Sequence, residues 1–341
     1  MDCIKSGIFG QIVGDALGLP VQFIKRDERI LDPVTDMRGY GAFNKPPGSW
    51  SDDSSLILAT MDGLSESLKR ADHEENLSLN EIIDYEIIMK NFSAWYNDGQ
   101  FTPYGYAYDI GGATMDGIKR YDNGCEPLKS GGIGERDNGN GSLMRILPIA
   151  FFIYCLSKKY SFDEDDKLTA VHNLSSLTHR HKRSPMTCGI YVNIALEFIE
   201  NNEKNLGLGL EGLIVNGINK SKEYYYNNTS FKEELHHFDR VFSLNIQNLP
   251  RDEIKSGGYC ISSLEASIWC LLNNENYKDT VLAAVNLGYD TDTTACIVGG
   301  LAGIYYGFDH IPSDWIEKLA ELDYIYDIVN EFSNEISKKI D

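Results

Sequence analysis

Two short clusters of acidic and hydroxyl side chains have the residue types and spacing of a metal site. The first contains Ser51, Asp52 and Asp53 and directly precedes an apolar run. Adjacent carboxylates beside a hydroxyl supply several hard oxygen ligands, which suit Mg²⁺, Mn²⁺ or Ca²⁺. A helix start explains them as well, because Ser51 can cap free amides and the carboxylates favour the positive end of the helix dipole. Taken alone, the first cluster favours capping over metal binding.

The second cluster contains Asp290, Asp292 and Thr293 and precedes a segment with several small residues, from Gly299 to Gly303. Small residues let helix backbones approach closely, so we expect this segment to be a central, buried helix. Capping by Asp290 or Asp292 would satisfy its polar start. Two sheltered carboxylates nevertheless repel each other, and a bound cation removes that conflict. Together the clusters could form a binuclear all-oxygen site, although their spacing does not show that they meet.

Zinc is disfavoured, because the chain has no H-E-x-x-H motif and no Cys/His knuckle. A candidate anion site is Gly139-Asn140-Gly141-Ser142. The glycines permit unusual backbone angles, Asn140 tolerates them, and a helix expected from Ser142 would direct its amides at a diphosphate. A plain loop with a serine cap is the alternative. His179 is either a ligand-binding or a structural histidine, and Asp109 either caps a helix or meets a cationic group.

The elements that must position these side chains are predicted to be helices. Apolar residues recur at spacings of three and four, and strand-like alternation is scarce. We therefore expect an all-α fold: a single compact multi-helix domain over residues 1–341 with the metal site at its centre. Residues 221–256, rich in Lys, Tyr, Asn and Glu, are expected to be an insertion or a pair of surface helices. The predicted helices lie near 4–18, 53–69, 79–96, 109–120, 142–157, 165–177, 184–201, 207–218, 262–273, 278–287, 292–305 and 313–336.

Composition excludes several classes of function. The chain has 31 basic and 51 acidic residues, a formal charge of -20, which disfavours non-specific binding to nucleic acids and anionic membranes. Seven cysteines without a C-x-x-C pair favour a reducing cytoplasm. The start of the chain lacks a basic signal-peptide region, and no apolar stretch reaches ~18 residues. We expect a cytoplasmic protein without a membrane span.

Taken in order, the motifs resemble those of the ADP-ribosylglycohydrolase family, which includes dinitrogenase reductase-activating glycohydrolases and ADP-ribosyl-acceptor hydrolases. Gly14-Asp15-Ala16-Leu17-Gly18 is similar to the family's G-D-A-L-G. Ser51-Asp52-Asp53-Ser54 is similar to its T-D-D-T, and Asp290-Thr291-Asp292-Thr293 matches its D-x-D-[TS]. Three further segments resemble family motifs in the same order: Tyr108-Asp109-Ile110-Gly111, Gly139-Asn140-Gly141-Ser142-Leu143-Met144-Arg145 and Thr178-His179.

The resemblance implies an all-helical hydrolase that removes ADP-ribose from a modified protein by attack of water on the anomeric carbon. It implies two Mg²⁺ or Mn²⁺ ions with these ligands: Ser51, Asp52, Asp53, Asp290, Asp292 and Thr293. It also implies ADP-ribose lying across the metals, in contact with the 139–142 loop and His179. The aspartates, among them Asp52, Asp53 and Asp292, are then the candidates for catalysis, with Asp52 or Asp53 as the base.

Three positions depart from the family pattern. The family often has glutamate where this chain has Gln22, and in the serine-directed branch that glutamate assists catalysis. Glutamine cannot accept a proton at neutral pH, so we favour ADP-ribosyl-arginine, whose guanidinium Asp109 could hold. Ser51 replaces the usual threonine, and Tyr289 replaces a common glycine and could narrow the pocket or stack on the substrate.

Other interpretations remain open at the level of sequence. The chain could be a catalytically reduced ADP-ribose-binding or structural member of the family. It could also hydrolyse another ADP-ribose linkage, or act as a two-metal phosphohydrolase on a small nucleotide.

Overall fold

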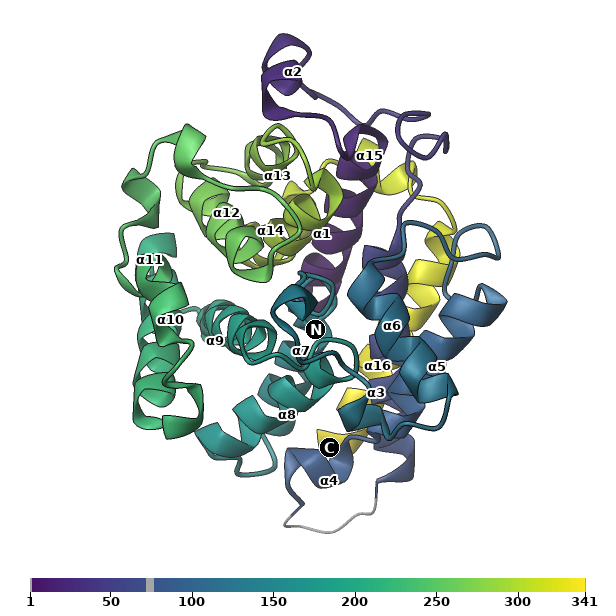
Figure 1. Cartoon of the computed structure of the whole chain (residues 1–341), viewed down its shortest axis with the longest axis vertical. Coiled ribbons are helices and arrows are strands. Elements are labelled where there is room, and N and C mark those ends of the chain that lie inside the picture. Colours follow the sequence, from purple (N-terminus) through teal and green to yellow (C-terminus); the bar gives the residue numbers. More distant parts are fainter. Residues whose placement is uncertain (1, 72–76, 341) are drawn as a thin grey trace.

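The structure, a computed structural model, describes residues 2–71 and 77–340 and consists of helices joined by loops and short 3-10 turns (Figure 1). No strand occurs within those two ranges, where the only β-type pairings are the single bridges Gly132–His179 and Gly139–Tyr259. The expected all-α class is confirmed. The helices are α1 (Asp2–Gly18), α2 (Arg26–Leu31), α3 (Asp52–Arg70), α4 (Leu79–Ile82), α5 (Tyr85–Asp98), α6 (Gly112–Asp122), α7 (Leu147–Leu156), α8 (Glu164–Ser176), α9 (Arg183–Lys204), α10 (Leu210–Asn227), α11 (Asp239–Phe242), α12 (Cys260–Leu272), α13 (Tyr277–Val285), α14 (Thr291–Tyr306), α15 (Ser313–Glu317) and α16 (Leu322–Ile340).

Helices α1 and α14 pack against each other along most of their length and are buried on nearly every side. A helix surrounded by protein needs no polar face, which agrees with the apolar sequences of both. Their backbones meet at glycines: a Cβ on Gly10 would lie 2.2 Å from the Gly299 carbonyl oxygen, and one on Gly14 2.2 Å from that of Ala295. We call this contact the glycine seam; its glycines are Gly10, Gly14, Gly18, Gly299 and Gly303. The expected central helix is confirmed.

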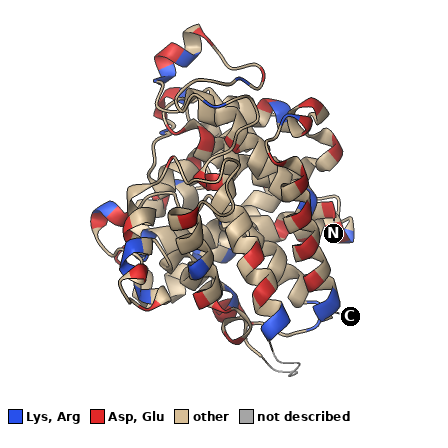
Figure 2. Ribbon diagram, turned by 90° about the vertical axis from the view of Figure 1, so that its right-hand side faces the viewer, with Lys and Arg blue, Asp and Glu red and all other residues tan. Residues whose placement is uncertain are grey.

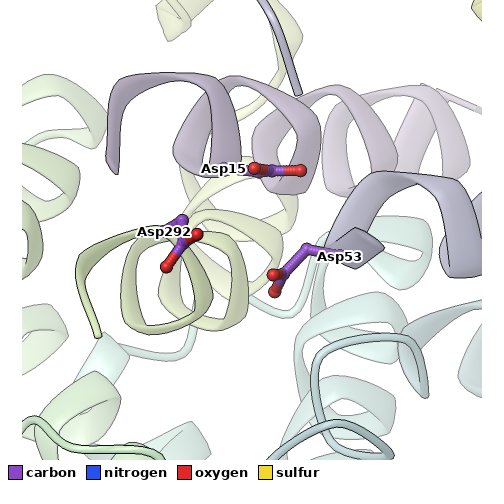
Figure 3. A group of neighbouring side chains, drawn as sticks. All are labelled: Asp15, Asp53 and Asp292. Atoms are coloured by element: carbon purple, nitrogen blue, oxygen red, sulfur yellow. The ribbon is translucent and has the colours of Figure 1, made fainter. Parts of the chain in front are cut away.

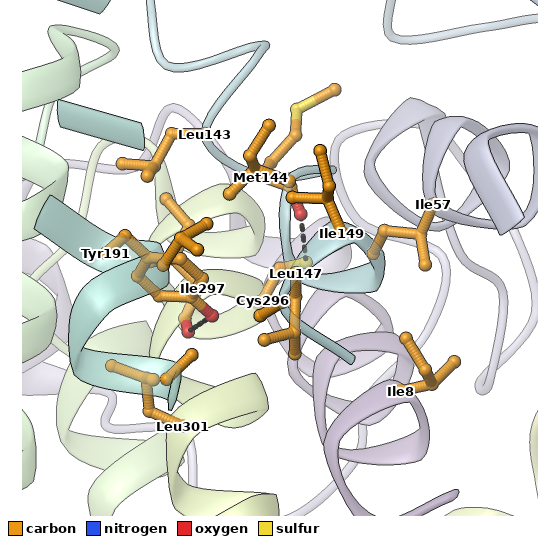
Figure 4. Close-up of a cluster of buried hydrophobic side chains, with 14 of the residues drawn as sticks. Ile8, Ile57, Leu143, Met144, Leu147, Ile149, Tyr191, Cys296, Ile297 and Leu301 are labelled. Carbon is orange, nitrogen blue, oxygen red and sulfur yellow. Dashed lines mark hydrogen bonds between the residues drawn. The ribbon is translucent and has the colours of Figure 1, made fainter. Parts of the chain in front are cut away.

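Aliphatic and aromatic side chains from α1, α3, α7, α9 and α14 form the core around the seam (Figure 4). The buried Tyr191 hydroxyl of this core donates to the Ile297 carbonyl at 2.9 Å. All seven cysteines are free thiols, and four of them are buried.

Three predicted helices are divided, or begin later than their apolar pattern indicates. The pattern over 79–96 runs through two helices, because the Asp84 side chain accepts hydrogen bonds from the amides of Glu86 and Ile87 and starts α5 anew. The helix predicted from Ser142 begins at Leu147, with Pro148 in its first turn. The segment 313–336 is interrupted before α16, where Glu321 has a positive φ of 53°.

Residues 221–256 do not form the expected pair of surface helices. Their first part continues α10 to Asn227, and the remainder consists of short 3-10 turns and the single-turn α11. Phe238, Val241 and Ile254 bury their side chains in the common core. The absence of a regular apolar period in this segment reflects turns held by a few buried anchors.

Lys, Arg, Asp and Glu are interspersed on the outer helices and loops (Figure 2). Among the described helices, none combines the length and the apolar character that crossing a membrane requires.

Candidate metal centre and ligand pocket

Three buried carboxylates converge from three helices: Asp15 of α1, Asp53 of α3 and Asp292 of α14 (Figure 3). One oxygen from each lies within 4.8 Å of the other two. The two acidic clusters also touch directly, because the Thr293 hydroxyl donates to Asp53 Oδ2 at 3.2 Å. The structure therefore brings together the clusters that sequence spacing alone could not connect.

Asp15 organises the start of α3. Its carboxylate accepts hydrogen bonds from the Ser51 amide at 2.9 Å and from the amide and hydroxyl of Ser54 at 3.1 and 2.5 Å. Both oxygens are engaged, so this side chain holds the first cluster in place from α1. The motif that contains Asp15 does not by itself indicate this role; a lone carboxylate in an apolar helix is the signal that could have found it.

The first cluster is also a helix cap, as its simpler interpretation predicted. The Ser51 hydroxyl accepts from the Asp53 amide and lies 3.2 Å from Asp53 Oδ2, to which it donates. Asp52 faces the neighbouring pocket, and no hydrogen bond from another described side chain holds its carboxylate. Capping and an accessible carboxylate therefore coexist at the start of α3.

In the second cluster neither carboxylate caps α14 across its first turn. Asp290 precedes the helix without a side-chain capping bond, and its Oδ2 accepts from Asn140 Nδ2 at 2.7 Å. The same side-chain Nδ2 also donates to the Ser263 hydroxyl at 2.9 Å. Within the described residues, Asp292 Oδ1 accepts from the Thr293 amide alone, at 2.9 Å. Asn140 thus links the glycine-rich loop to the acidic centre.

The electrostatics of this centre call for a cation. Burial, reinforced by the neighbouring carboxylates, raises the pKa values of Asp52, Asp53 and Asp292 well above their usual range. Burial raises the pKa of Asp109 to about 6. In the described ranges, no Lys, Arg or His forms an ion pair with any of these groups.

Several buried oxygens at the centre lack a hydrogen-bond donor. They are Asp53 Oδ1, Asp292 Oδ2, Asp109 Oδ2 and Gln22 Oε1. Buried acceptors without donors are costly, and like-charged carboxylates that share a site add repulsion. A hard divalent cation binds carboxylate, hydroxyl and amide oxygens, so it would both coordinate the donorless acceptors and reduce the repulsion between the carboxylates. The residues present therefore fit an oxygen-ligated metal centre.

A pocket of about 670 Å³ opens over this centre. Of the predicted site residues, those that line it are Asp52, Asp109, Gly139, Asn140, Gly141, His179, Tyr289, Asp290 and Thr293. Ser51, Asp53 and Asp292 are buried and are not among the lining residues. Ser142 is fully buried, and its hydroxyl contacts Ser175 at 2.9 Å and Cys188 at 3.5 Å, away from the pocket.

The glycine-rich loop forms one wall of the pocket without a helix behind it. Residues 140–145 form bends and turns, so the predicted row of helical amides starting at Ser142 is wrong. The loop is instead held by the backbone N–H of Asn140, which donates to the Gly258 carbonyl at 3.0 Å. Gly257 and Gly258 line the pocket too, although no sequence motif singled them out.

The opposite wall carries two residues in the left-handed region, Phe23 with φ 68° and Tyr289 with φ 64°. Their backbones pair: the Phe23 amide donates to the Tyr289 carbonyl at 2.7 Å, and the Tyr289 amide to the Ile24 carbonyl at 2.8 Å. Tyr289 is about half exposed and lines the pocket. Asp109 has a positive φ of 54° and does not cap α6, whose N-cap is Gly111.

Comparisons with known proteins agree with this architecture. The family model for ADP-ribosylglycohydrolase matches residues 1–341. The chain is 29% identical to "ADP-ribosylarginine hydrolase Tri1" of Serratia proteamaculans over 97% of its length and 79% of that protein. It is 25% identical to "ADP-ribosyl-[dinitrogen reductase] glycohydrolase" of Rhodospirillum rubrum over 93% of its length and 90% of that protein.

A solved structure, titled "ADP-ribosylglycohydrolase-related protein complex", has the same fold, with a TM-score of 0.71 and 23% identity over 98% of both chains. The relatives confirm the expected hydrolase of glycosyl bonds. The full-length family match agrees with the order of the six motifs and with the convergence of the two acidic clusters at one pocket. This chain belongs to the ADP-ribosylglycohydrolase family.

Proposed function

We propose that the protein is a metal-dependent ADP-ribosylglycohydrolase that removes ADP-ribose from arginine residues of modified proteins. The observation that carries this proposal is the group of donorless buried oxygens beneath a pocket large enough for a nucleotide. Two relatives named "ADP-ribosylarginine hydrolase Tri1", at 29% and 28% identity, support arginine as the acceptor.

Two Mg²⁺ or Mn²⁺ ions fit this centre, with ligands from both acidic clusters: Ser51, Asp52, Asp53, Asp290, Asp292 and Thr293. Asp15 is better placed as a support, since four hydrogen bonds already engage its oxygens. When bound, such ions would supply Lewis acidity and neutralise the carboxylate cluster. Gln22 Oε1 is a further buried oxygen facing the pocket.

Asp52 is our proposed proton acceptor. Its carboxylate lines the pocket, whereas Asp53 lies deeper and its Oδ2 already accepts from two hydroxyl groups. In hydrolysis, a water oxygen bonds to the anomeric carbon while the bond from that carbon to the arginine nitrogen breaks. One water proton passes to Asp52 and then to the departing guanidine, which leaves as a cation. Asp292 and Asp53 stabilise the positive charge that develops on the ribose.

The nucleotide and the acceptor meet different walls. Gly139, Asn140, Gly141 and His179 would contact the ADP-ribose, and Ser142 supports that loop from behind through Ser175. Asp109 and Tyr289 would meet the arginine side chain, the first through its charge and the second through its ring. Gln22 carries no charge and cannot serve as a base there.

A direct test measures release of ADP-ribose from an arginine-modified protein with and without Mg²⁺ or Mn²⁺. We expect turnover only with the divalent metal, complete loss with excess chelator, and slower release from serine-linked substrate. Tight binding of ADP-ribose without release from any linkage would favour the reduced, ADP-ribose-binding alternative. Release of phosphate would indicate a phosphohydrolase.

Metal binding should also appear as a change in stability. A ligand that binds only the folded state at 100 times its Kd adds ~2.7 kcal/mol to the free energy of unfolding. We expect Mg²⁺ or Mn²⁺ to raise the Tm of the chelator-treated protein by several degrees, while K⁺ at matched ionic strength has little effect. An unchanged Tm with every divalent ion would contradict the metal centre.

A further inference from the structure

Arg145 is a fully buried cation without a carboxylate partner among the described residues, in a chain that has 20 more acidic than basic residues. Its guanidinium lies over the Phe92 ring, 4.4 Å from the centroid. It donates to the Thr178 hydroxyl at 2.8 Å and reaches the Leu174 carbonyl at 3.4 Å. A buried charge is costly unless it is paired and hydrogen-bonded, and a neutral residue would avoid that cost. A role that needs the N–H donors of arginine accounts for a charged residue here.

The Thr178 hydroxyl connects Arg145 to the pocket. Its oxygen lies 2.8 Å from Nδ1 of His179, and these two contacts are its only side-chain hydrogen bonds in the described part of the chain. Arginine can only donate, so the hydroxyl oxygen must accept from Arg145. The hydroxyl proton then has one available acceptor, Nδ1 of His179. If Nδ1 carried a proton instead, the buried hydroxyl proton would have no acceptor.

The other side of the His179 ring faces the ligand pocket. A Cβ on Gly139 would lie 3.3 Å from Nε2, and one on Gly141 3.4 Å, so the ring rests against the glycine-rich loop. The backbone of His179 is fixed by its amide, which donates to the Ser175 carbonyl at 2.9 Å. Burial, together with the charge of Arg145, lowers the pKa of His179 to about 3, so the ring is neutral at physiological pH.

We propose that Arg145 and Thr178 are positioning residues that hold His179 in the tautomer protonated at Nε2, which presents an N–H donor to the ligand pocket. The donor suits an acceptor oxygen of the bound ADP-ribose, a part of the inference that rests on the proposed function. The tautomer itself follows from the hydrogen bonds alone. Neither Gly139 nor Gly141 has a positive φ, so the expected unusual backbone angles do not explain them. A side chain at either position would instead crowd the donor edge of the ring.

The test uses full-length protein labelled with ¹⁵N at histidine, without ligand, in a two-bond ¹H–¹⁵N correlation experiment. The His179 signals are assigned by comparison with His179→Gln. We expect the proton on Nε2 and a bare Nδ1 in the wild type. A proton on Nδ1, or a mixture of tautomers, overturns the proposal without reference to any variant.

Variants then separate this role from simple packing. Thr178→Val removes the hydroxyl at nearly constant volume, so we expect mixed tautomers and an approximately tenfold weaker Kd for ADP-ribose by calorimetry. Thr178→Ser keeps the hydroxyl and should retain both wild-type properties. Arg145→Met should also give mixed tautomers, because it removes the donor to the Thr178 oxygen and frees the Leu174 carbonyl to accept the hydroxyl proton. If folded Thr178→Val gives the wild-type spectrum, the proposed role of Thr178 is overturned. If folded Arg145→Met gives the wild-type spectrum, the proposed role of Arg145 is overturned.

The outcome also distinguishes the two proposals. An Nε2-protonated His179 in a protein that neither binds ADP-ribose nor hydrolyses its linkages would leave the positioning role intact and contradict the proposed function. Normal hydrolysis of the ADP-ribose linkage by a protein with His179 protonated at Nδ1 would support the proposed function and contradict the positioning role.

Discussion

Asp53→Asn is expected to reduce hydrolysis of ADP-ribosyl-arginine by at least about 10³-fold, or ~4 kcal/mol of transition-state stabilisation. The substitution keeps the shape of the side chain and removes one charge from the metal centre. Its amide oxygen can still accept from Ser51 and Thr293, while the new NH₂ group takes the place of Oδ1, which has no donor. Turnover under saturating Mg²⁺ or Mn²⁺ measures this effect.

The variant should remain folded. Because the pKa of Asp53 is raised in the folded protein, its ionised form destabilises the metal-free state as the pH rises above the ordinary aspartate range. Removing that charge should leave the metal-free Tm at pH 7 equal to or above that of the wild type, and should abolish the Tm increase on adding metal.

Asp62→Asn is the matched control. Asp62 belongs to the same helix and is partly buried, but its carboxylate accepts from Asn91 Nδ2 at 2.8 Å, remote from the pocket. Its activity should match the wild type. Substantial hydrolysis by Asp53→Asn, with the control unaffected, would contradict a metal or catalytic role for Asp53.

Gly299→Ala should lower the free energy of unfolding by about 2–4 kcal/mol, although it adds only one methyl group. The new Cβ would lie 2.2 Å from the Gly10 carbonyl oxygen, a distance that the backbones of α1 and α14 can relieve only by moving apart. Chemical denaturation of the metal-free protein measures the loss. Separation of the helices also moves Asp15 away from Asp292, so we expect a smaller Tm increase with metal.

Gly212→Ala provides the comparison for this substitution. Gly212 is exposed in α10, and no atom lies within 4 Å of a Cβ placed there. Alanine is the better helix former by about 0.8–1.0 kcal/mol, so this variant should be slightly more stable than the wild type. Equal stabilisation by both alanine variants would contradict the close approach at the glycine seam.

The sequence predicted the helical class and most long helices, because apolar spacing records which face of a helix is buried. It failed where a local hydrogen bond overrides that pattern. The apolar residues around Asp84 continue without a break, and only the capping bonds to Glu86 and Ile87 divide the segment into two helices. Near Ser142, the glycine loop continues as turns until Pro148 favours a helical first turn.

The acidic centre was predictable in its members but not in its geometry. Each cluster offered oxygen ligands, yet the contact between Thr293 and Asp53 depends on how α3 meets α14. The role of Asp15 could not be predicted, because the neighbouring sequence does not show which distant amides will donate hydrogen bonds to a single aspartate. The link from Arg145 through Thr178 to His179 joins three side chains from two loops and could be recognised only after folding.

The pairing of α1 with α14 has a consequence for synthesis of the chain. The ribosome completes α1 long before α14, so its glycine face and Asp15 remain without their partner until residues 291–306 emerge. Contacts between such distant segments form late, because the intervening chain must be ordered first. A nascent chain therefore carries only the first of the two acidic clusters until α14 has been synthesised. The proposed ligands of the divalent ion come together only after that.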